Sequence, residues 1–204
     1  MYYIINRFQK KEKDMKMNHL EIEYKTLLSK TAFDNLQPLF KQAPLVQQTN
    51  YYIDSPDFSL REHKMALRIR TYENRAELTL KIPKTVGNME YNQLMSLEEG
   101  ENLLQTFSLP AGEIKSILEQ ENIALSSLEI LGSLTTLRRE MALPIGLLAL
   151  DESQYLGTTD YELEMEVSDA EKGEQDFMDF LHTHGISYQA APSKIARFAQ
   201  KLAK

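Results

Sequence analysis

The sequence predicts an α+β fold in which about eight antiparallel strands close into a barrel with a charged interior and helices packed on its outside. Three observations lead to this prediction. Short runs of period-two alternation occur in two blocks, with a helical section between them. Several of these runs place their charged residues on one strand face and their apolar residues on the other. The helical segments carry apolar stripes, which would cover the apolar strand faces and leave the charged faces turned toward one another.

The first block begins with a strand over Leu20–Leu27, in which charged and apolar residues alternate. Ser29 has the character of a helix N-cap, because apolar residues recur at helical spacing from Phe33 toward or across a break at Pro38. Turn residues separate the remaining strands, and connections this short join antiparallel neighbours. These strands are expected at Val46–Asp54, Met65–Tyr72, Ala76–Ile82 and Asn88–Ser96.

A helical section and a second block of strands follow. Gly132 and several Gly/Pro turns separate the strands of this block. The strands are expected at Leu128–Leu131, Ser133–Leu143, Leu147–Tyr155 and Tyr161–Val167. The helices are expected over Leu97–Phe107, over Pro110–Glu121, from a cap at Ser168 or Asp169 to about His184, and from Pro192-Ser193 onward.

Residues 18–204 contain no internal repeat, linker or low-complexity stretch, so we expect them to form a single domain. Residues 1–17 include a dense basic run and are expected to be a solvated, flexible tail. Met15 or Met17 offers an alternative start within that tail. An intact mass of the native protein that begins at Met1 would contradict this alternative start.

Composition excludes several classes of function. The 204 residues include 30 acidic and 23 basic side chains, and the net charge of −7 argues against a generally basic nucleic-acid-binding protein. The absence of cysteine excludes disulfides and thiolate nucleophiles, and with only four histidines a zinc site is not expected. No apolar run approaches the roughly 18 residues of a membrane helix, and no secretory signal is recognisable. We therefore expect a cytoplasmic protein with no nucleic-acid or membrane partner, and the sequence leaves its oligomeric state open.

Charged residues repeatedly share one face of a predicted strand. A sheet with one solvated face is the ordinary origin of such alternation. Here, however, like charges cluster at i, i+2 spacing, and because neighbouring like charges repel, the clusters require counter-ions. The same-face groups are Glu21, Glu23 and Lys25; Arg68 and Arg70; Glu77, Thr79 and Lys81; Arg138 and Glu140; and Glu162, Glu164 and Glu166.

Inside a barrel, these charges indicate a particular kind of ligand. Charges in a confined space are costly without water, mutual pairing or bound ions. Grouped carboxylates without histidine or cysteine suit Mg²⁺ or Mn²⁺, which prefer oxygen ligands. Grouped arginines and lysines suit phosphate oxygens. Acidic clusters beside basic clusters therefore point to a metal-bound polyphosphate.

A series of short motifs spans residues 18–204. It begins with a Glu-x-Glu-x-Lys pattern, Glu21-Ile22-Glu23-Tyr24-Lys25. The motifs that follow are Asn50-Tyr51-Tyr52-Ile53-Asp54, Ala66-Leu67-Arg68-Ile69-Arg70, Leu78-Thr79-Leu80-Lys81, Arg138, Leu150-Asp151, Tyr161-Glu162-Leu163-Glu164 and Ser193-Lys194-Ile195-Ala196-Arg197-Phe198. In this order they resemble the CYTH domain superfamily, also called triphosphate tunnel metalloenzymes, whose members include thiamine triphosphatase, inorganic triphosphatase and class IV adenylate cyclases.

The resemblance implies an eight-stranded tunnel that binds a linear triphosphate together with a divalent metal. It implies phosphate contacts for basic residues on the strands, namely Lys25, Arg68, Arg70, Lys81 and Arg138. It implies metal binding for acidic residues, namely Glu21, Glu23, Asp151, Glu162 and Glu164. A catalytic role is implied for Glu21, Glu23, Lys25, Glu162 and Glu164.

Other charged residues have two interpretations. Lys194 and Arg197 lie on one side of the last predicted helix, so they either contact phosphate at the tunnel mouth or belong to a solvated helix face. By alternation, Arg139 is expected to face away from Arg138. Four further acidic residues are expected in the lumen, where a role as counter-charge is favoured over a role as metal ligand. They are Glu77, Glu90, Glu140 and Glu166.

We expect metal-dependent hydrolysis of inorganic triphosphate, or of a nucleoside or other organic triphosphate, with Mg²⁺ or Mn²⁺ as cofactor. An adenylate cyclase is one alternative, although the region where the cyclase branch carries a His-Phe pair reads Thr49-Asn50-Tyr51-Tyr52. A module that binds polyphosphate or a nucleotide without hydrolysing it is the other. The five implied metal ligands and the five implied phosphate-binding strand residues balance in charge, so the net negative charge lies outside this set.

Overall fold

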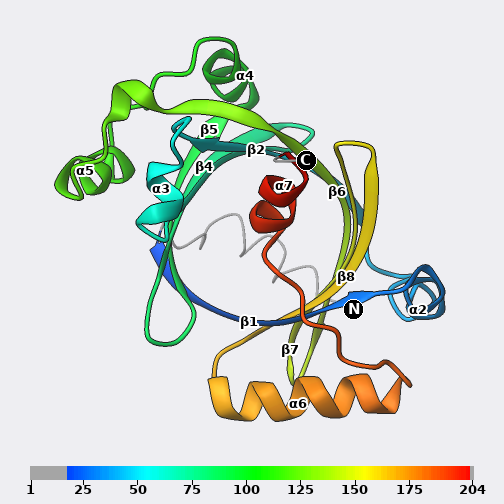
Figure 1. Cartoon of the computed structure of the whole chain (residues 1–204). Helices are drawn as coiled ribbons and strands as arrows, with labels where there is room; N and C mark the ends of the chain where they lie inside the picture. Colours follow the sequence, from blue (N-terminus) through cyan, green and yellow to red (C-terminus); the bar gives the residue numbers. More distant parts are fainter. Residues whose placement is uncertain (1–17, 203–204) are drawn as a thin grey trace, which may run out of the picture.

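Eight antiparallel strands close into a barrel in this computed structural model, which describes residues 18–202 (Figure 1). The order of strands around the barrel is β1-β5-β4-β3-β2-β6-β7-β8, and β8 pairs with β1 to close it. The predicted α+β barrel is therefore confirmed. The predicted tail, residues 1–17, lies outside the described residues.

The strands follow the period-two segments of the sequence closely. Their bounds are β1 (Asn18–Leu28), β2 (Leu45–Asp54), β3 (Ala66–Thr71), β4 (Arg75–Pro83), β5 (Asn88–Ser96), β6 (Glu129–Leu143), β7 (Gly146–Tyr155) and β8 (Thr158–Val167). β1 completes the barrel because its two halves pair with different neighbours. Its residues 18–21 pair with β5, and its residues 22–28 pair with β8.

Helices occupy some of the connections between strands, and two more helices follow the last strand. They are α2 (Lys30–Leu36), α3 (Ser59–Glu62), α4 (Leu97–Gln105), α5 (Glu113–Gln120), the 3₁₀ turn η1 (Leu125–Ser127), α6 (Ala170–Thr183) and α7 (Lys194–Leu202). Two predicted N-caps are confirmed, because the side chains of Ser29 and Asp169 accept backbone hydrogen bonds from Ala32 and Lys172. α2 ends before Pro38, which lacks the N–H that helix continuation needs. No described helix combines the length and apolar character needed to span a membrane.

Two apolar cores lie between the outer barrel wall and the helices. One includes Leu78 and Leu80 of β4 with Leu118 of α5, and the other includes Leu163 of β8 with Phe177 of α6. Burial of such a side chain contributes about 1.5–3 kcal/mol. Since strand neighbours point to opposite faces, the residues between these core positions point into the barrel. Helix packing on the outside thus turns the charged faces inward, as expected.

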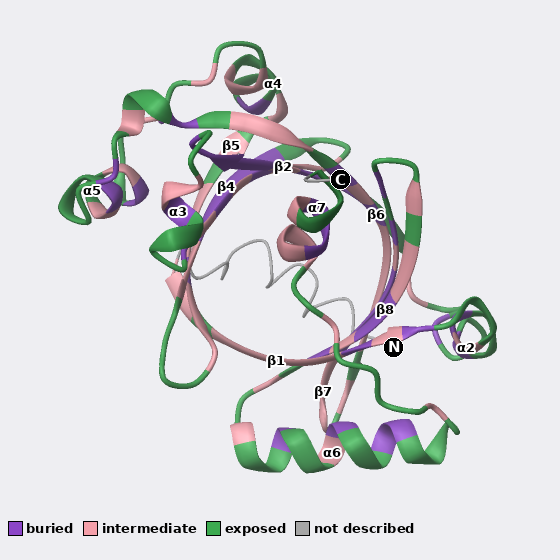
Figure 2. Cartoon of the chain, viewed as in Figure 1, coloured by how far each residue is buried: buried purple, intermediate pink, exposed green. Residues whose placement is uncertain are grey.

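Helix α7 differs from the other helices, because it lies within the ring of strands when the barrel is viewed end-on (Figure 1). Its Phe198 is 1% exposed and packs on Tyr52 and Tyr155, with ring centroids 5.4 and 6.5 Å apart. Leu134 of β6 completes this small core. Figure 2 shows buried residues on α7 and on the strands beside it. α7 therefore closes one end of the barrel with apolar side chains.

The predicted break at Gly132 is wrong, because β6 runs unbroken from Glu129 to Leu143. Gly132 lies in this strand with φ of +150°, and β2 changes register opposite it, between Tyr52 and Ile53. A Cβ at Gly132 would lie 2.6 Å from Cζ of Phe198. Glycine here accommodates a bulge and the close approach of α7, and does not end the strand.

We expect Gly132→Ala to destabilise the protein by about 2 kcal/mol, because the added methyl group overlaps the Phe198 ring and the backbone is strained at this φ. Gly157→Ala is a matched control, since Gly157 also has a positive φ, +72°, but its Cβ would meet no atom within 4 Å. Denaturant unfolding of the two variants measures the difference. Equal losses of stability would show that Phe198 does not require a glycine.

Candidate functional site in the barrel interior

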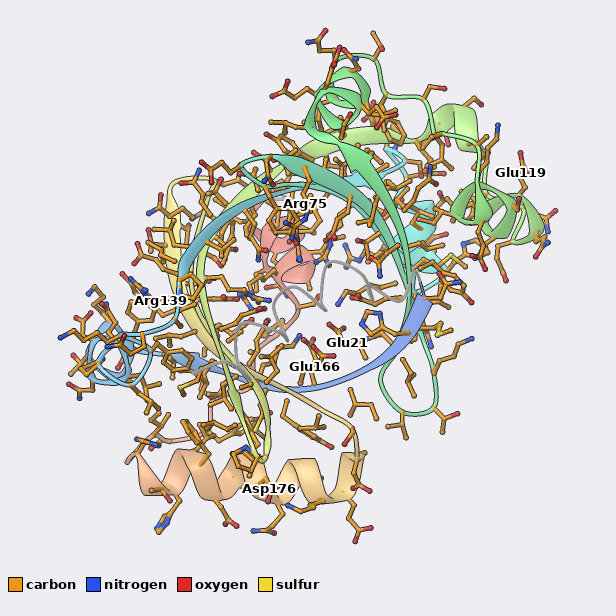
Figure 3. All side chains as sticks on the ribbon, turned by 180° about the vertical axis from the view of Figure 1, so that it is seen from behind. Glu21, Arg75, Glu119, Arg139, Glu166 and Asp176 are labelled. Atoms are coloured by element: carbon orange, nitrogen blue, oxygen red, sulfur yellow. The ribbon has the colours of Figure 1, made fainter. Side chains whose placement is uncertain are left out.

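Strand register brings the predicted charged residues to one inner surface. Residues directly opposite one another in paired strands share a face. Arg138 of β6 lies opposite Asp151 of β7, which in turn lies opposite Glu162 of β8. Glu164 lies opposite Lys25. Figure 3 shows Glu21 and Glu166 inside the ring of strands, whereas Arg139, Glu119 and Asp176 lie outside it.

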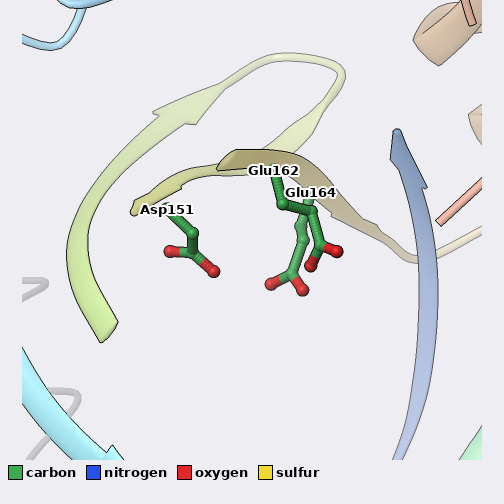
Figure 4. A group of neighbouring side chains, drawn as sticks. All are labelled: Asp151, Glu162 and Glu164. Carbon is green, nitrogen blue, oxygen red and sulfur yellow. The ribbon is translucent and has the colours of Figure 1, made fainter. Parts of the chain in front are cut away.

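Three carboxylates converge on the inner wall formed by β7 and β8 (Figure 4). Asp151, Glu162 and Glu164 each offer an oxygen within 4.8 Å of the oxygens of the other two. Asp151 and Glu162 are completely buried. We call these residues the carboxylate trio. An all-oxygen set of this kind fits a hard divalent cation, so the residues present are suited to a divalent metal.

Two cations, Lys194 and Arg138, each contact more than one carboxylate of the trio in this structure. Nζ of Lys194 lies 2.5 Å from Glu162, 2.7 Å from Glu164 and 2.8 Å from Asp151. Arg138 donates through Nε and Nη2 to the two oxygens of Asp151, at 2.7 and 2.6 Å, and also contacts Glu164. The trio, Lys194 and Arg138 therefore belong to one ion-pair network that joins β6, β7, β8 and α7.

Arg197 fixes α7 to the barrel and is 7% exposed. Its Nε donates to Asp160 at 2.9 Å, and its Nη1 donates to Glu162 and to the carbonyl of Pro192. The hydroxyl of Tyr155 also donates to Asp160, at 2.8 Å. The solvated-face interpretation of Lys194 and Arg197 is thus wrong, since both side chains are buried among carboxylates. The sequence reasoning missed Asp160, although it shares its strand parity with Glu162 and Glu164.

A second group of charges lies on the walls formed by β1, β4 and β5. Nζ of Lys81 lies 2.5 Å from Glu21 and also contacts Glu90. Lys25 pairs with Glu23. Among the described residues, the converging metal-ligand group contains neither Glu21 nor Glu23. The five predicted metal ligands therefore divide between two walls of the barrel.

The wall formed by β2 and β3 carries the two predicted arginines. Arg70 donates from Nε to Asn50 at 2.8 Å and lies 3.6 Å from Glu77. Nε of Arg68 is buried and has no hydrogen-bond partner within residues 18–202. The predicted counter-charge role is confirmed for Glu77, and equally for Glu90 and Glu140, which pair with Lys81 and Arg138.

The ion pairs shift the pKa values of the carboxylate trio. Burial opposes ionisation of Glu164 and Asp151, but Lys194 and Arg138 outweigh it and lower the pKa of both groups. For Glu162 burial prevails, and together with the neighbouring Glu164 it raises the pKa to about 7. Burial lowers the pKa of Lys194, but the trio outweighs it and raises that pKa. Both cations consequently stay charged at neutral pH.

Glu90 provides a test of the interior charges through acid stability. Burial alone would raise its pKa, but Lys81 and Arg68 outweigh burial and lower the pKa to about 2. A carboxylate with a lowered pKa in the folded state stabilises the fold above its unfolded pKa, and this contribution is lost as the pH falls from about 4.5 to 2. We expect Glu90→Gln to lower the free energy of unfolding by about 2 kcal/mol at pH 7.

Denaturant unfolding of Glu90→Gln and the unchanged protein between pH 7 and pH 2 measures this contribution. The difference between them should shrink as the pH falls below about 4.5. Glu101→Gln, on the exposed surface of α4, is the control and should change stability little at any pH. A difference that stays constant with pH would contradict the ion-pair explanation.

Comparisons with known proteins agree with this architecture. A Bacillus subtilis (strain 168) protein called "Putative triphosphatase YjbK" is 36% identical over 187 residues, which cover 91% of this chain and 97% of that protein. A crystal structure from Bacillus halodurans, described as a putative adenylate cyclase, is 37% identical with a TM-score of 0.84 and covers 89% of this chain and 98% of that one. The Hippeastrum protein HpAC1 shares the fold at 24% identity, with a TM-score of 0.74 over 89% of this chain and 96% of that one. The CYTH domain model matches residues 19–199, so this chain belongs to the CYTH domain family.

Proposed function

We propose that this protein hydrolyses a triphosphate inside the barrel, with the help of a divalent metal. One observation carries the proposal: the interior places a converging carboxylate trio beside walls that carry arginines and lysines. Carboxylates suit a hard cation, and guanidinium and ammonium groups suit phosphate oxygens. The 36% identity to the Bacillus subtilis protein called "Putative triphosphatase YjbK" supports the same activity.

We propose Mg²⁺ or Mn²⁺ as the metal, held by Asp151, Glu162 and Glu164, with Glu21 and Glu23 on β1, the strand that pairs with β8. When bound, such a metal neutralises phosphate charge and lowers the pKa of water. Lys194 and Arg138 already pair with the trio here, so metal binding would require these two cations to turn toward the substrate. That rearrangement would free their N–H groups for phosphate oxygens, which suits the phosphate-binding role predicted for both.

The basic residues would bind and align the triphosphate chain. The proposed contacts come from several walls of the barrel, namely from Lys25, Arg68, Arg70, Lys81, Arg138, Lys194 and Arg197. Donors fixed on opposite walls hold a linear anion along the barrel axis and stabilise charge on the leaving phosphate. Because α7 closes one end, the substrate would enter from the other end. Glu21, Glu23, Lys25, Glu162 and Glu164 are the proposed catalytic residues.

A screen of metals against substrates tests the function. Inorganic tripolyphosphate, ATP and other nucleoside triphosphates are incubated with Mg²⁺ or Mn²⁺, and phosphate release is measured with and without EDTA. We expect phosphate release with at least one substrate and none after EDTA is added. Tight tripolyphosphate binding without turnover under every metal would favour a binding module instead.

Adenylate cyclase activity is the second candidate, because the Bacillus halodurans structure described as a "putative adenylate cyclase" is 37% identical to this chain. The two activities differ in their products from ATP. Hydrolysis yields phosphate, whereas cyclisation yields cyclic AMP and pyrophosphate. Chromatographic separation of the products therefore decides between them, and cyclic AMP as the main product would overturn the hydrolase assignment.

Arg68→Ala should raise KM for the triphosphate by at least about tenfold, because a buried guanidinium that contacts phosphate contributes about 1.5–3 kcal/mol. The unpartnered Nε of Arg68 makes this residue a sensitive test of phosphate binding. Arg61→Ala serves as the control, since Arg61 is exposed on α3, outside the barrel, where it packs on the ring of Phe58. Steady-state kinetics measure the effect, and an unchanged KM for Arg68→Ala would remove Arg68 from the binding site.

A further inference from the structure

Asn50 belongs to the inner wall of the barrel but carries no charge. It lies on β2, opposite Arg70 of β3 and Leu134 of β6, and is 1% exposed. Alternation along β2 places Asn50 on the same face as Tyr52, whose ring contacts the barrel-closing Phe198. The Asn50 amide is therefore held inside the barrel, beside the arginine pair.

The contact with Arg70 fixes the orientation of this amide. An arginine Nε–H can only donate, so the atom it meets at 2.8 Å must be the carbonyl oxygen, Oδ1. The NH₂ group of Asn50 then points away from Arg70. Its nitrogen, Nδ2, is buried and has no hydrogen-bond partner in the part of the chain that the structure describes.

An unpaired buried donor is costly, typically by about 1–3 kcal/mol. A second such donor, Nε of Arg68, lies on the same wall. Arg68 is opposite Tyr52, which is two residues along β2 from Asn50. Two buried donors on one wall match a ligand that offers only acceptors. The oxygens of a phosphate chain are acceptors of this kind, whereas a hydroxyl or amide ligand would bring donors of its own.

We propose that Asn50 is a substrate-binding residue, whose Nδ2 donates a hydrogen bond to a phosphate oxygen of the bound triphosphate. This assignment rests on the proposed function. The neutral amide adds a hydrogen bond to the phosphate without adding charge to a wall that already carries two arginines. Its oxygen meanwhile holds Arg70, so one side chain contacts the substrate and orients an arginine.

The competing explanation is that Asn50 only orients Arg70, and a double-mutant cycle separates the two explanations. Arg70→Met removes the group that Asn50 would orient. Asn50→Leu, introduced into Arg70→Met, then replaces the amide and its Nδ2 donor with an apolar side chain of similar size. This double variant leaves neither the amide oxygen nor its NH₂ group unpaired, so it is expected to fold, which thermal unfolding would verify. Gln47→Leu in the same background is the control, because it also replaces a side-chain amide with leucine, but at an exposed position of β2.

The readouts are the dissociation constant for inorganic tripolyphosphate by calorimetry in EDTA, and KM and kcat with the metal that supports turnover. If Asn50 touches the substrate, Asn50→Leu weakens tripolyphosphate binding about tenfold even without Arg70, whereas Gln47→Leu does not. If Asn50 acts only through Arg70, Asn50→Leu has no effect in that background, and the assignment is overturned while the proposed function stands. Failure of the unchanged protein to bind or hydrolyse any triphosphate would overturn the proposed function and, with it, this assignment.

Discussion

Replacing Glu162 with glutamine is expected to reduce metal-dependent phosphate release by at least about a hundredfold, with the barrel still folded. Glu162 is completely buried, and its oxygens converge with those of Asp151 and Glu164. Glutamine has nearly the same size and can still accept hydrogen bonds from Lys194 and Arg197. It lacks the negative charge that a divalent cation requires, however, so the trio would lose metal affinity without losing its packing.

The control for this prediction lies on the same strand. Glu166→Gln changes an inward-facing residue of β8 that lies outside the carboxylate trio, so phosphate release should change little (Figure 3). Glu21→Gln tests the neighbouring strand β1, where Glu21 pairs with Lys81, and should also reduce turnover strongly. Initial rates over a range of Mg²⁺ and Mn²⁺ concentrations distinguish weaker metal binding from slower chemistry. Undiminished rates for Glu162→Gln and Glu21→Gln would contradict the proposed metal site.

The inward direction of the charges was predictable from the sequence because it depends on strand parity, which is a local property. Parity placed Arg138, Glu162 and Glu164 on inner faces, and the register of β6, β7 and β8 confirms that placement. Parity does not say which acids meet which bases, since that depends on how far each strand is shifted against its neighbour. The separation of Glu21 from the carboxylate trio was for this reason not predictable.

The position of α7 was also beyond sequence reasoning. Its apolar stripe predicts that one side is buried but does not identify the surface it covers. Lys194 and Glu164 are 30 residues apart in the chain, so their ion pair depends on the whole β8–α6–α7 connection. The predicted break at Gly132 is wrong for a related reason. Glycine usually marks a turn, and only the approach of Phe198 from another part of the chain shows why it lies within a strand.

Replacing Lys194 with methionine is expected to give the largest loss of stability in metal-free protein, about 3–5 kcal/mol. The ammonium of Lys194 lies within 2.8 Å of all three carboxylates of the trio, and methionine fills similar space without a charge. Removing one partner of a buried ion pair leaves the other uncompensated, and here three carboxylates would share Arg138 and Arg197. Lys201→Met, at an exposed position of the same helix, should have little effect.

Divalent metal should reverse much of this loss, because a cation bound by the trio replaces the missing ammonium and stabilises the folded state by mass action. Thermal unfolding of Lys194→Met in EDTA, Mg²⁺ and Mn²⁺ measures the rescue. The same measurement on Lys201→Met gives the change in melting temperature that each metal causes when Lys194 is present. Acid should reduce the loss as well, since protonated carboxylates no longer need a counter-ion. If Lys194→Met is destabilised but its melting temperature rises with metal no more than that of Lys201→Met, the trio is an ion-pair network that does not bind metal. If the rise is several degrees larger, the carboxylates that Lys194 neutralises here are the ones that bind the metal.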